Sequence, residues 1–331
     1  MKRIVVVAFA LAACGPASTR EPAPVVIAPP DTASSVADSL VVDGVTLRAT
    51  MLTPAPVTCP APWPVALIHA GSGPTDRNGN GPLMGGDNNS LRMLAEGLAH
   101  RCIASLRYDK RGIGASVAFG MREQDLRFQT FAGDAAAWLR RLQGDARFGD
   151  VVVIGHSEGA ALVTLAAREV PVSGAVLIAG AGRPAGEILR EQLQRGLPPQ
   201  LYAEADSALT SLEAGRTIEN PPPELFALLR PSIQPYLISW LPVDPAAELA
   251  ALDVPALVVW GTTDAQVARA DAERLAAADD DVRLVVVEGM NHVLKVVPAD
   301  DPVAQRASYG DPTLPLAPEL LPAIASFIHE L

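Results

Sequence analysis

The sequence has few aromatic residues and few cations, and both shortages narrow the classes of possible function. Aromatic side chains make up 5% of the 331 residues, and 26 Lys and Arg stand against 37 Asp and Glu, which gives a formal net charge of −11. Surfaces that bind nucleic acid or anionic membranes carry basic patches, and RNA-binding modules add clustered aromatic side chains. Because the chain has no basic stripe or aromatic cluster, we expect its folded part to bind neither.

Long hydrophobic runs and internal repeats are also missing. The apolar run of Ile4 to Leu11 is too short to span a bilayer, and it follows Lys2 and Arg3. A positive start followed by a short apolar run is typical of a targeting segment, so residues 1–13 are predicted to be a signal peptide. An ordinary secretory signal without lipid attachment would also fit this run, as would a short buried segment.

Cysteine is rare as well, and the first of the three cysteines follows the signal segment directly. Leu11-Ala12-Ala13-Cys14 resembles the lipobox of bacterial lipoproteins. The resemblance implies cleavage before Cys14 and lipid attachment to it. Gly15, where an Asp would imply retention at the inner membrane, implies sorting to the outer membrane. We therefore expect a lipid-anchored protein of the cell envelope on the periplasmic side, with a secreted protein as the alternative.

Residues 14–37 are rich in Pro, Ala, Ser and Thr and lack the apolar residues that a core needs. Such a composition predicts an extended tether between the lipid anchor and a folded domain. The folded domain is predicted to cover residues 38–331, which is long enough for one large α/β domain with an insertion, or for two ordinary domains.

Strand and helix patterns alternate along this domain. Asp43-Gly44 is a hairpin turn signal between two apolar runs at its start. The expected strands that follow are 64–69, 102–108, 151–154, 175–179, 254–260 and 282–287, and the expected helices are 90–100, 130–142, 158–170, 265–278 and 318–331. This alternation predicts the α/β class, with a mostly parallel central sheet and helices on both faces.

The alternation stops between about residues 183 and 244. This stretch is interrupted by prolines, has helical patterns and contains no convincing strand. It predicts a helical cap inserted before the last strands. Its apolar residues either shape an acyl pocket or pack the cap on the sheet; these are Leu189, Leu193, Leu228, Leu229 and Leu237.

The chemistry is expected around Gly155-His156-Ser157-Glu158-Gly159, which matches the pattern G-x-S-x-G. The pattern follows the apolar strand of Val151 to Ile154 and precedes a helical run. A strand that turns sharply into a helix through two glycines presents the intervening serine at the carboxyl edge of the sheet, where it can act as a nucleophile. The alternative is that Ser157 only caps the helix.

A serine nucleophile needs a histidine base and a carboxylate that orients the base. His292 lies in the loop after the last predicted strand, and Asp264 follows the strand before it. The order Ser157, Asp264, His292 is the one expected when each residue follows its own strand of such a sheet. The other four histidines are less suitable as the base. His156 lies in the tight turn beside Ser157 and His69 precedes Ser157 in the sequence, while His100 and His329 lie in or at the end of predicted helices.

An oxyanion hole needs two backbone N–H donors directed at the developing negative charge. Glu158 is expected to supply one of them, from the start of its helix. The other is expected from the glycine-rich loop after His69, with Ser72 as the first choice and Gly71 as the second. The alternative is that these glycines only form a turn.

Several segments together resemble a known family. They are residues 70–80, 106–112, 155–159, 261–267 and 291–295. On these segments the chain, from about residue 40 to its end, resembles bacterial serine carboxylesterases of the α/β-hydrolase superfamily, secreted or lipoprotein-type. One departure is His69-Ala70, where these hydrolases often have His-Gly.

The resemblance implies hydrolysis of a small carboxylic ester through an acyl-enzyme on Ser157, with Asp264 and His292 completing the triad. It implies no cofactor and no metal, and no obligate protein partner is evident. A peptidase or an acyltransferase using the same triad is the alternative. Preferential cleavage of peptide amides would favour the peptidase, and transfer to an alcohol would favour the acyltransferase.

Three further features have two interpretations each. The segment from Asp76 to Asp87 imitates the oxygen spacing of an EF-hand loop, although a strand and not a helix precedes it. Asp109 and Arg111 either read the substrate or brace a strand end that is crowded with charge. Cys59 and Cys102 each precede a neighbouring strand, and they either pair as a disulfide or remain thiols.

Overall fold

The structure is a computed structural model that describes residues 32–82 and 86–331. The predicted signal peptide, the lipidation site Cys14 and most of the predicted tether lie outside the described residues. Within the described part of the chain, no helix is both long enough and apolar enough to cross a membrane.

One eight-stranded sheet organises the chain, in the order β1-β2-β4-β3-β5-β6-β7-β8. The pairs β1–β2 and β2–β4 are antiparallel, so β2 runs opposite to the other strands; all other neighbouring pairs are parallel, as predicted. The strands are β1 (Ser34–Val42), β2 (Val45–Thr53), β3 (Trp63–His69), β4 (Ala104–Tyr108), β5 (Phe148–His156), β6 (Gly174–Ile178), β7 (Ala256–Gly261) and β8 (Val282–Val287).

The hairpin of β1 and β2 corrects the predicted domain boundary. Asp43 and Gly44 form the predicted turn, both with positive φ, and Val42 pairs with Val45. However, β1 begins at Ser34, which pairs with Thr53, so residues 34–37 belong to the sheet and not to the tether. This part of the strand was not predicted because its composition is polar. An edge strand exposes most of its side chains and therefore needs few apolar residues.

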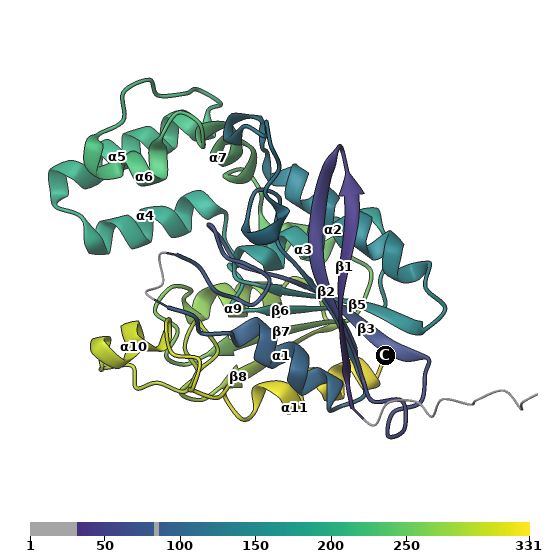
Figure 1. Ribbon diagram of the computed structural model, residues 1–331. Coiled ribbons are helices and arrows are strands. Elements are labelled where there is room, and N and C mark those ends of the chain that lie inside the picture. The colour runs from purple at the N-terminus through teal and green to yellow at the C-terminus, as the bar shows by residue number, and fades with distance from the viewer. Residues whose placement is uncertain (1–31, 83–85) are drawn as a thin grey trace, which may run out of the picture.

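Helices cover both faces of the sheet (Figure 1). One face packs against α1 and α11, and the other packs mainly against α2 and α3, with α8 and α9 further along it. The helices named here are α1 (Ser90–Ala99), α2 (Phe128–Gln143), α3 (Glu158–Glu169), α8 (Pro245–Ala250), α9 (Arg269–Ala276) and α11 (Leu320–His329).

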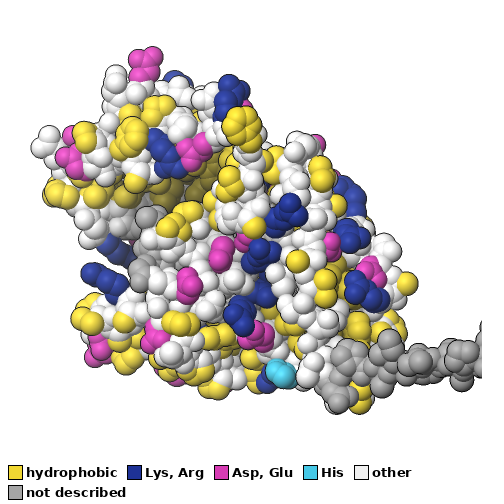
Figure 2. Space-filling model, viewed as in Figure 1, with side chains coloured by type: hydrophobic (Ala, Val, Ile, Leu, Met, Phe, Trp, Pro, Cys, Tyr) yellow, Lys and Arg dark blue, Asp and Glu magenta, His cyan; other side chains and the backbone are white. Residues whose placement is uncertain are grey.

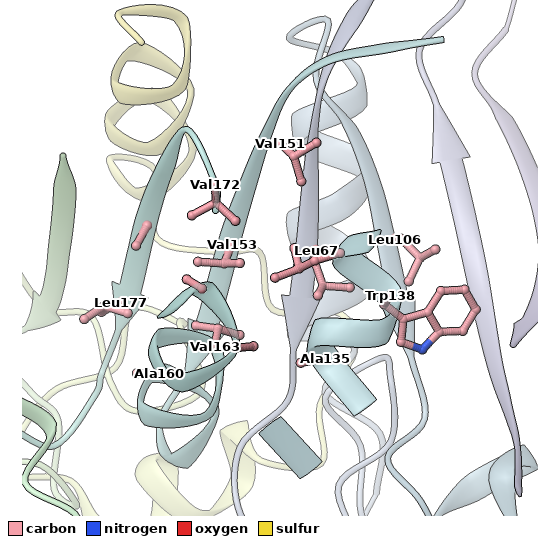
Figure 3. Close-up of a cluster of buried hydrophobic side chains, with 14 of the residues drawn as sticks. Leu67, Leu106, Ala135, Trp138, Val151, Val153, Ala160, Val163, Val172 and Leu177 are labelled. Carbon is pink, nitrogen blue, oxygen red and sulfur yellow. The ribbon is translucent and has the colours of Figure 1, made fainter. Parts of the chain in front are cut away.

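Successive side chains of β5 point to opposite faces of the sheet and contribute to the hydrophobic core on each face. Val151 and Val153 point to the face of α2 and α3, as Figure 3 shows, while Val152 and Ile154 point to the face of α1 and α11. All four are buried, so β5 is apolar on both faces, as expected for a central parallel strand.

The cap lies between β6 and β7 and has its own small apolar core. It consists of α4 (Ala185–Gly196), α5 (Pro199–Glu213), η3 (Pro223–Leu225), α6 (Phe226–Leu229) and α7 (Gln234–Trp240). Leu209, Leu212 and Leu229 are fully buried among these helices. Figure 1 shows the cap projecting from one edge of the sheet.

Several short elements were not predicted. The short 3-10 helices η1 (Gly114–Ser116) and η2 (Glu123–Asp125) lie between β4 and α2, and α10 (Pro302–Ser308) lies between β8 and α11. Like α7 and α8, α10 has a proline in its first turn and spans about two turns or fewer. Helices this short do not show a readable helical period.

Cys59 and Cys102 form a disulfide, which settles the interpretation that the sequence left open. Their separation of 43 residues means that the bridge closes a loop around β3 and α1. A cross-link of this kind restricts the unfolded chain and typically contributes about 2–4 kcal/mol to the free energy of unfolding.

The turn from β5 into α3 depends on very close backbone packing. A Cβ on Gly155 would lie 2.5 Å from Ala160 Cα and would also meet the Gly159 carbonyl oxygen. A Cβ on Gly159 would lie 2.7 Å from the carbonyl oxygens of His69 and Ala70. Both glycines are therefore required because backbone atoms occupy the space of a side chain.

Gly155→Ala is expected to lower the free energy of unfolding by about 3 kcal/mol, because the added methyl group collides with backbone that cannot move away. Gly149→Ala is the matched control on the same strand, since its Cβ would have no neighbour nearer than 4.0 Å. The control should change stability by less than about 0.5 kcal/mol. Urea denaturation of both variants measures this, and equal stabilities would contradict the packing argument.

Candidate active site

Ser157 occupies the turn between β5 and α3 in a conformation that serine rarely adopts. Its φ is 55° and its ψ is −123°, and its N–H donates to the Ile178 carbonyl at 2.9 Å. Ser157 makes no side-chain capping hydrogen bond to the helix, so the capping interpretation fails. A strained serine held by the surrounding backbone is typical of a functional position.

The structure brings together the three residues that the sequence predicted. His292 Nε2 lies 3.1 Å from Ser157 Oγ, and His292 Nδ1 lies 2.9 Å from Asp264 Oδ2. The side chains of His292 and Asp264 are almost completely shielded from solvent. With Nδ1 protonated and donating to Asp264, Nε2 is free to accept the serine proton.

Asp264 is held as a carboxylate. Burial alone would raise its pKa, but attraction to His292, the hydrogen bond from that ring and two backbone donors outweigh burial and lower the pKa. The backbone donors are the N–H groups of Gln266, at 2.8 Å, and Val267, at 3.0 Å. The carboxylate is thereby fixed in position and in charge.

Hydrogen bonds between the loops after β7 and β8 hold the aspartate and the histidine together. Thr263 Oγ1 donates to the Gly289 carbonyl at 2.9 Å, and Gly289 N–H donates to Thr262 Oγ1 at 2.8 Å. Gly261 lies so close to the Met290 backbone that no Cβ would fit between them. The two loops therefore position their catalytic candidates as one unit.

The remaining histidines do not reach the serine hydroxyl as bases. His156 points away from it and contacts the His292 carbonyl through Nε2 at 2.8 Å; burial, with a smaller effect of His292, lowers its pKa to about 4. His69 is buried behind the glycine-rich loop, and burial, followed by the charge of Lys110, lowers its pKa to about 3. His100 and His329 are exposed.

Two N–H groups beside Ser157 are available for an oxyanion. The amides of Ser72 and Glu158 have no hydrogen-bond acceptor within residues 32–82 and 86–331, and both residues line the cavity next to Ser157. Gly71 does not line this cavity; it packs against Ser157 instead, where an added Cβ would be 3.1 Å from Ser157 Cβ. The arrangement favours Ser72 over Gly71 as the second donor.

Sequence reasoning missed two polar side chains at this site. Lys110 is buried, and its ammonium donates to the carbonyl oxygens of Gly71 and Gly73. Tyr236, on α7 of the cap, interacts with the Glu158 carboxyl. Burial raises the pKa of Glu158, while Lys110 and Tyr236 offset part of that rise. In the sequence, the only indication that Lys110 belongs to the site was its position in the charged segment 109–111 at the end of a strand.

The cap and the sheet edge enclose a cavity of about 110 Å³ that opens onto Ser157. Ile188, Leu189 and Trp240 give it apolar walls, while Arg183 and Gln192 add polar groups. Figure 2 shows the molecule hollowed between the cap and the main body. Of the five leucines considered in the cap, only Leu189 lines the cavity; the others belong to the apolar cluster of the cap.

Asp109 and Arg111 brace the structure, which is one of the two interpretations that the sequence allowed. Asp109 accepts from the backbone N–H of Arg77 at 2.9 Å and of Ala115 at 2.8 Å, and Arg111 forms a buried ion pair with Asp134. Neither lines the cavity beside Ser157. Their role at this strand end is internal pairing.

The loop from Asp76 to Asp87 does not have the arrangement of an EF-hand. Asp76 Oδ1 accepts from the N–H groups of Asn78 and Asn80 at 2.8 and 2.9 Å, and Asn78 Oδ1 accepts from the Arg107 guanidinium. Two of the expected ligand oxygens are thus occupied by internal donors. No cluster of three or more His, Cys, Asp or Glu side chains suited to a metal ion occurs in the part of the chain that the structure describes.

Solved structures share this architecture at low sequence identity. Est1E from Butyrivibrio proteoclasticus aligns with a TM-score of 0.56 and 17% identity, covering 89% of this chain and 98% of that one. Proline iminopeptidase from Mycobacterium smegmatis aligns with a TM-score of 0.55 and 15% identity, with the same coverage of both chains. At these identities the likeness concerns the fold alone.

Sequence comparison adds a curated relative and a family. Esterase EstD from Thermotoga maritima is 29% identical over 248 residues, which are 73% of this chain and 58% of the relative. The chain thus matches less than two thirds of that protein's length. The family model described as "Alpha/beta hydrolase family" matches residues 67–308, which include the turn at Ser157, the loops that carry Asp264 and His292, and the cap. The chain belongs to the alpha/beta hydrolase family.

Proposed function

We propose that the protein is a serine hydrolase that cleaves carboxylic esters through an acyl-enzyme on Ser157. One observation carries the proposal: His292 lies within hydrogen-bond reach of Ser157 Oγ on one ring nitrogen and of Asp264 on the other. This is the geometry that activates a serine hydroxyl. Similarity to an esterase from Thermotoga maritima adds support for the ester as the scissile group.

The proposed reaction has two symmetrical halves. Ser157 Oγ attacks the ester carbonyl carbon while His292 Nε2 takes its proton, and the oxyanion is held by the N–H groups of Ser72 and Glu158. His292 then gives the proton to the leaving alcohol, which leaves the acyl group on Ser157. Water then attacks the acyl carbonyl carbon while His292 Nε2 takes its proton. Collapse of the second oxyanion breaks the bond to Ser157 Oγ, which regains a proton from His292 as the acid leaves. Asp264 stabilises the imidazolium in both halves.

The walls of the cavity indicate the kind of acyl group. Ile188, Leu189 and Trp240 would contact a group attached to the carbonyl carbon at Ser157, and the volume of about 110 Å³ suits a small one. We therefore expect esters of short or compact acids to be preferred over long-chain lipids.

Ser157→Ala is expected to lower kcat/KM for p-nitrophenyl acetate by at least about 10⁴-fold, because it removes the hydroxyl that lies within hydrogen-bond reach of His292 Nε2. The same variant should lose all labelling by a fluorophosphonate probe. Ser211→Ala, at a half-buried position on α5 that does not line the cavity, is the matched control and should behave as the wild type does. Turnover by Ser157→Ala close to that of the wild type would contradict the proposal.

We also propose that Cys14 carries lipid and anchors the domain to the periplasmic side of the outer membrane. The proposal rests on the lipobox-like sequence that ends at Cys14 and on the polar stretch that follows it. A secreted, unanchored protein is the alternative.

Cys14→Ser is expected to abolish incorporation of labelled palmitate and to release the protein from the membrane fraction. Gly15→Asp is the matched control, because it keeps the lipidated cysteine and should shift only the sorting, toward the inner membrane. Palmitate labelling followed by membrane fractionation measures both effects. Undiminished labelling of Cys14→Ser would contradict lipidation at this residue.

A further inference from the structure

Lys110 is a buried cation that donates to no carboxylate of the described residues, and it contacts the glycine-rich loop instead. Its side chain comes from the end of β4, and only 4% of the residue is exposed. Its ammonium donates to the Gly71 carbonyl and, at 2.8 Å, to the Gly73 carbonyl. Burial lowers the pKa of Lys110, and the charge of Glu158 offsets part of that effect. Burying a cation costs free energy, so two charge-assisted hydrogen bonds to one short loop require an explanation.

The two carbonyls that Lys110 holds lie on either side of Ser72. In a trans peptide the C=O of one residue and the N–H of the next point in opposite directions. Fixing the Gly71 carbonyl on Lys110 therefore fixes the direction of the Ser72 N–H on the other side of the same peptide plane. The next plane is fixed separately, because Thr75 Oγ1 donates to the Ser72 carbonyl at 2.8 Å.

The loop needs such an anchor. Gly73 has a positive φ of 67°, and Gly71 and Gly73 lack side chains that would limit their backbone rotation. Ser72 itself is exposed at the mouth of the cavity. Without Lys110, the carbonyl of the peptide between Gly71 and Ser72 would accept no hydrogen bond from a described residue, and nothing would fix the orientation of this peptide.

Lys110 also interacts with Glu158, the residue that supplies the other oxyanion donor. Its charge and that of the Glu158 carboxylate stabilise each other, and the backbone N–H of Glu158 is the other oxyanion donor. The positive charge lies behind the loop, on the side opposite to the Ser72 N–H. It adds a favourable potential at the position where negative charge develops.

We propose that Lys110 is the positioning residue of the oxyanion hole: it holds the Gly71–Ser72 peptide so that the Ser72 N–H points at the substrate carbonyl. This inference rests on the proposed function, because it assumes acyl transfer at Ser157. It assigns Lys110 a role in the transition state and none in binding the ground state.

Lys110→Met tests this role, since methionine fills the space without donating hydrogen bonds. Its kcat for p-nitrophenyl acetate should fall about 10- to 100-fold while KM changes less than about 3-fold. The decisive readout compares this ester with its thiono analogue, in which sulfur replaces the carbonyl oxygen and accepts hydrogen bonds poorly. The ratio of oxo to thiono rates should shrink at least about 10-fold in Lys110→Met.

Lys295→Met is the matched control, because Lys295 is also buried and donates to the Leu314 carbonyl, away from the oxyanion loop. It should keep the wild-type ratio even if its stability falls. Lys110→Gln, which retains a donor, should give an intermediate ratio and serves where Lys110→Met does not fold. Folding is checked by circular dichroism.

The outcomes separate the two proposals. Wild-type protein that shows no Ser157-dependent ester hydrolysis would overturn the proposed function itself. If the wild type is active but folded Lys110→Met keeps the wild-type ratio of oxo to thiono rates, only the proposed role of Lys110 is overturned. Failure of both Lys110 variants to fold would assign Lys110 to stability and would equally overturn its proposed role.

Discussion

Close backbone packing at the turn between β5 and α3 is the constraint on which the rest of the site depends. Gly155 and Gly159 leave no room for side chains, so the backbone of α3 lies directly against β5 and the end of β3. Ser157 is thereby forced into a positive φ, with its hydroxyl raised above the sheet edge. Because the neighbouring parallel strands all end at this edge, their loops deliver the other catalytic candidates to the same place.

Buried polar groups around this turn are arranged so that charge is confined to a few positions. His69 and His156 are kept neutral near neutral pH by burial, while Asp264 is kept ionised by its donors. The buried charge of Lys110 is balanced in part by Glu158. Such a site presents fixed dipoles to the substrate and needs little rearrangement when negative charge develops.

Much of this was predictable from the sequence because topology places residues that follow strands at one edge. That reasoning brought Ser157, Asp264 and His292 together, and the structure agrees. It missed Lys110, because a lysine at a strand end is usually solvated and its contacts depend on how a distant loop folds. It missed Tyr236, because α7 is too short to show a helical period and the placement of the cap on the sheet is set by tertiary packing.

If Ser157 carries the acyl group during turnover, the acyl-enzyme can be trapped on it. The protein is mixed with excess p-nitrophenyl acetate, quenched in acid within the first turnover and digested for mass spectrometry. We expect an added acetyl mass on the peptide that contains Ser157, located at Ser157 itself. Complete hydrolysis with the acetyl group on another residue, or with none on the protein at any time, would contradict an acyl-enzyme on Ser157.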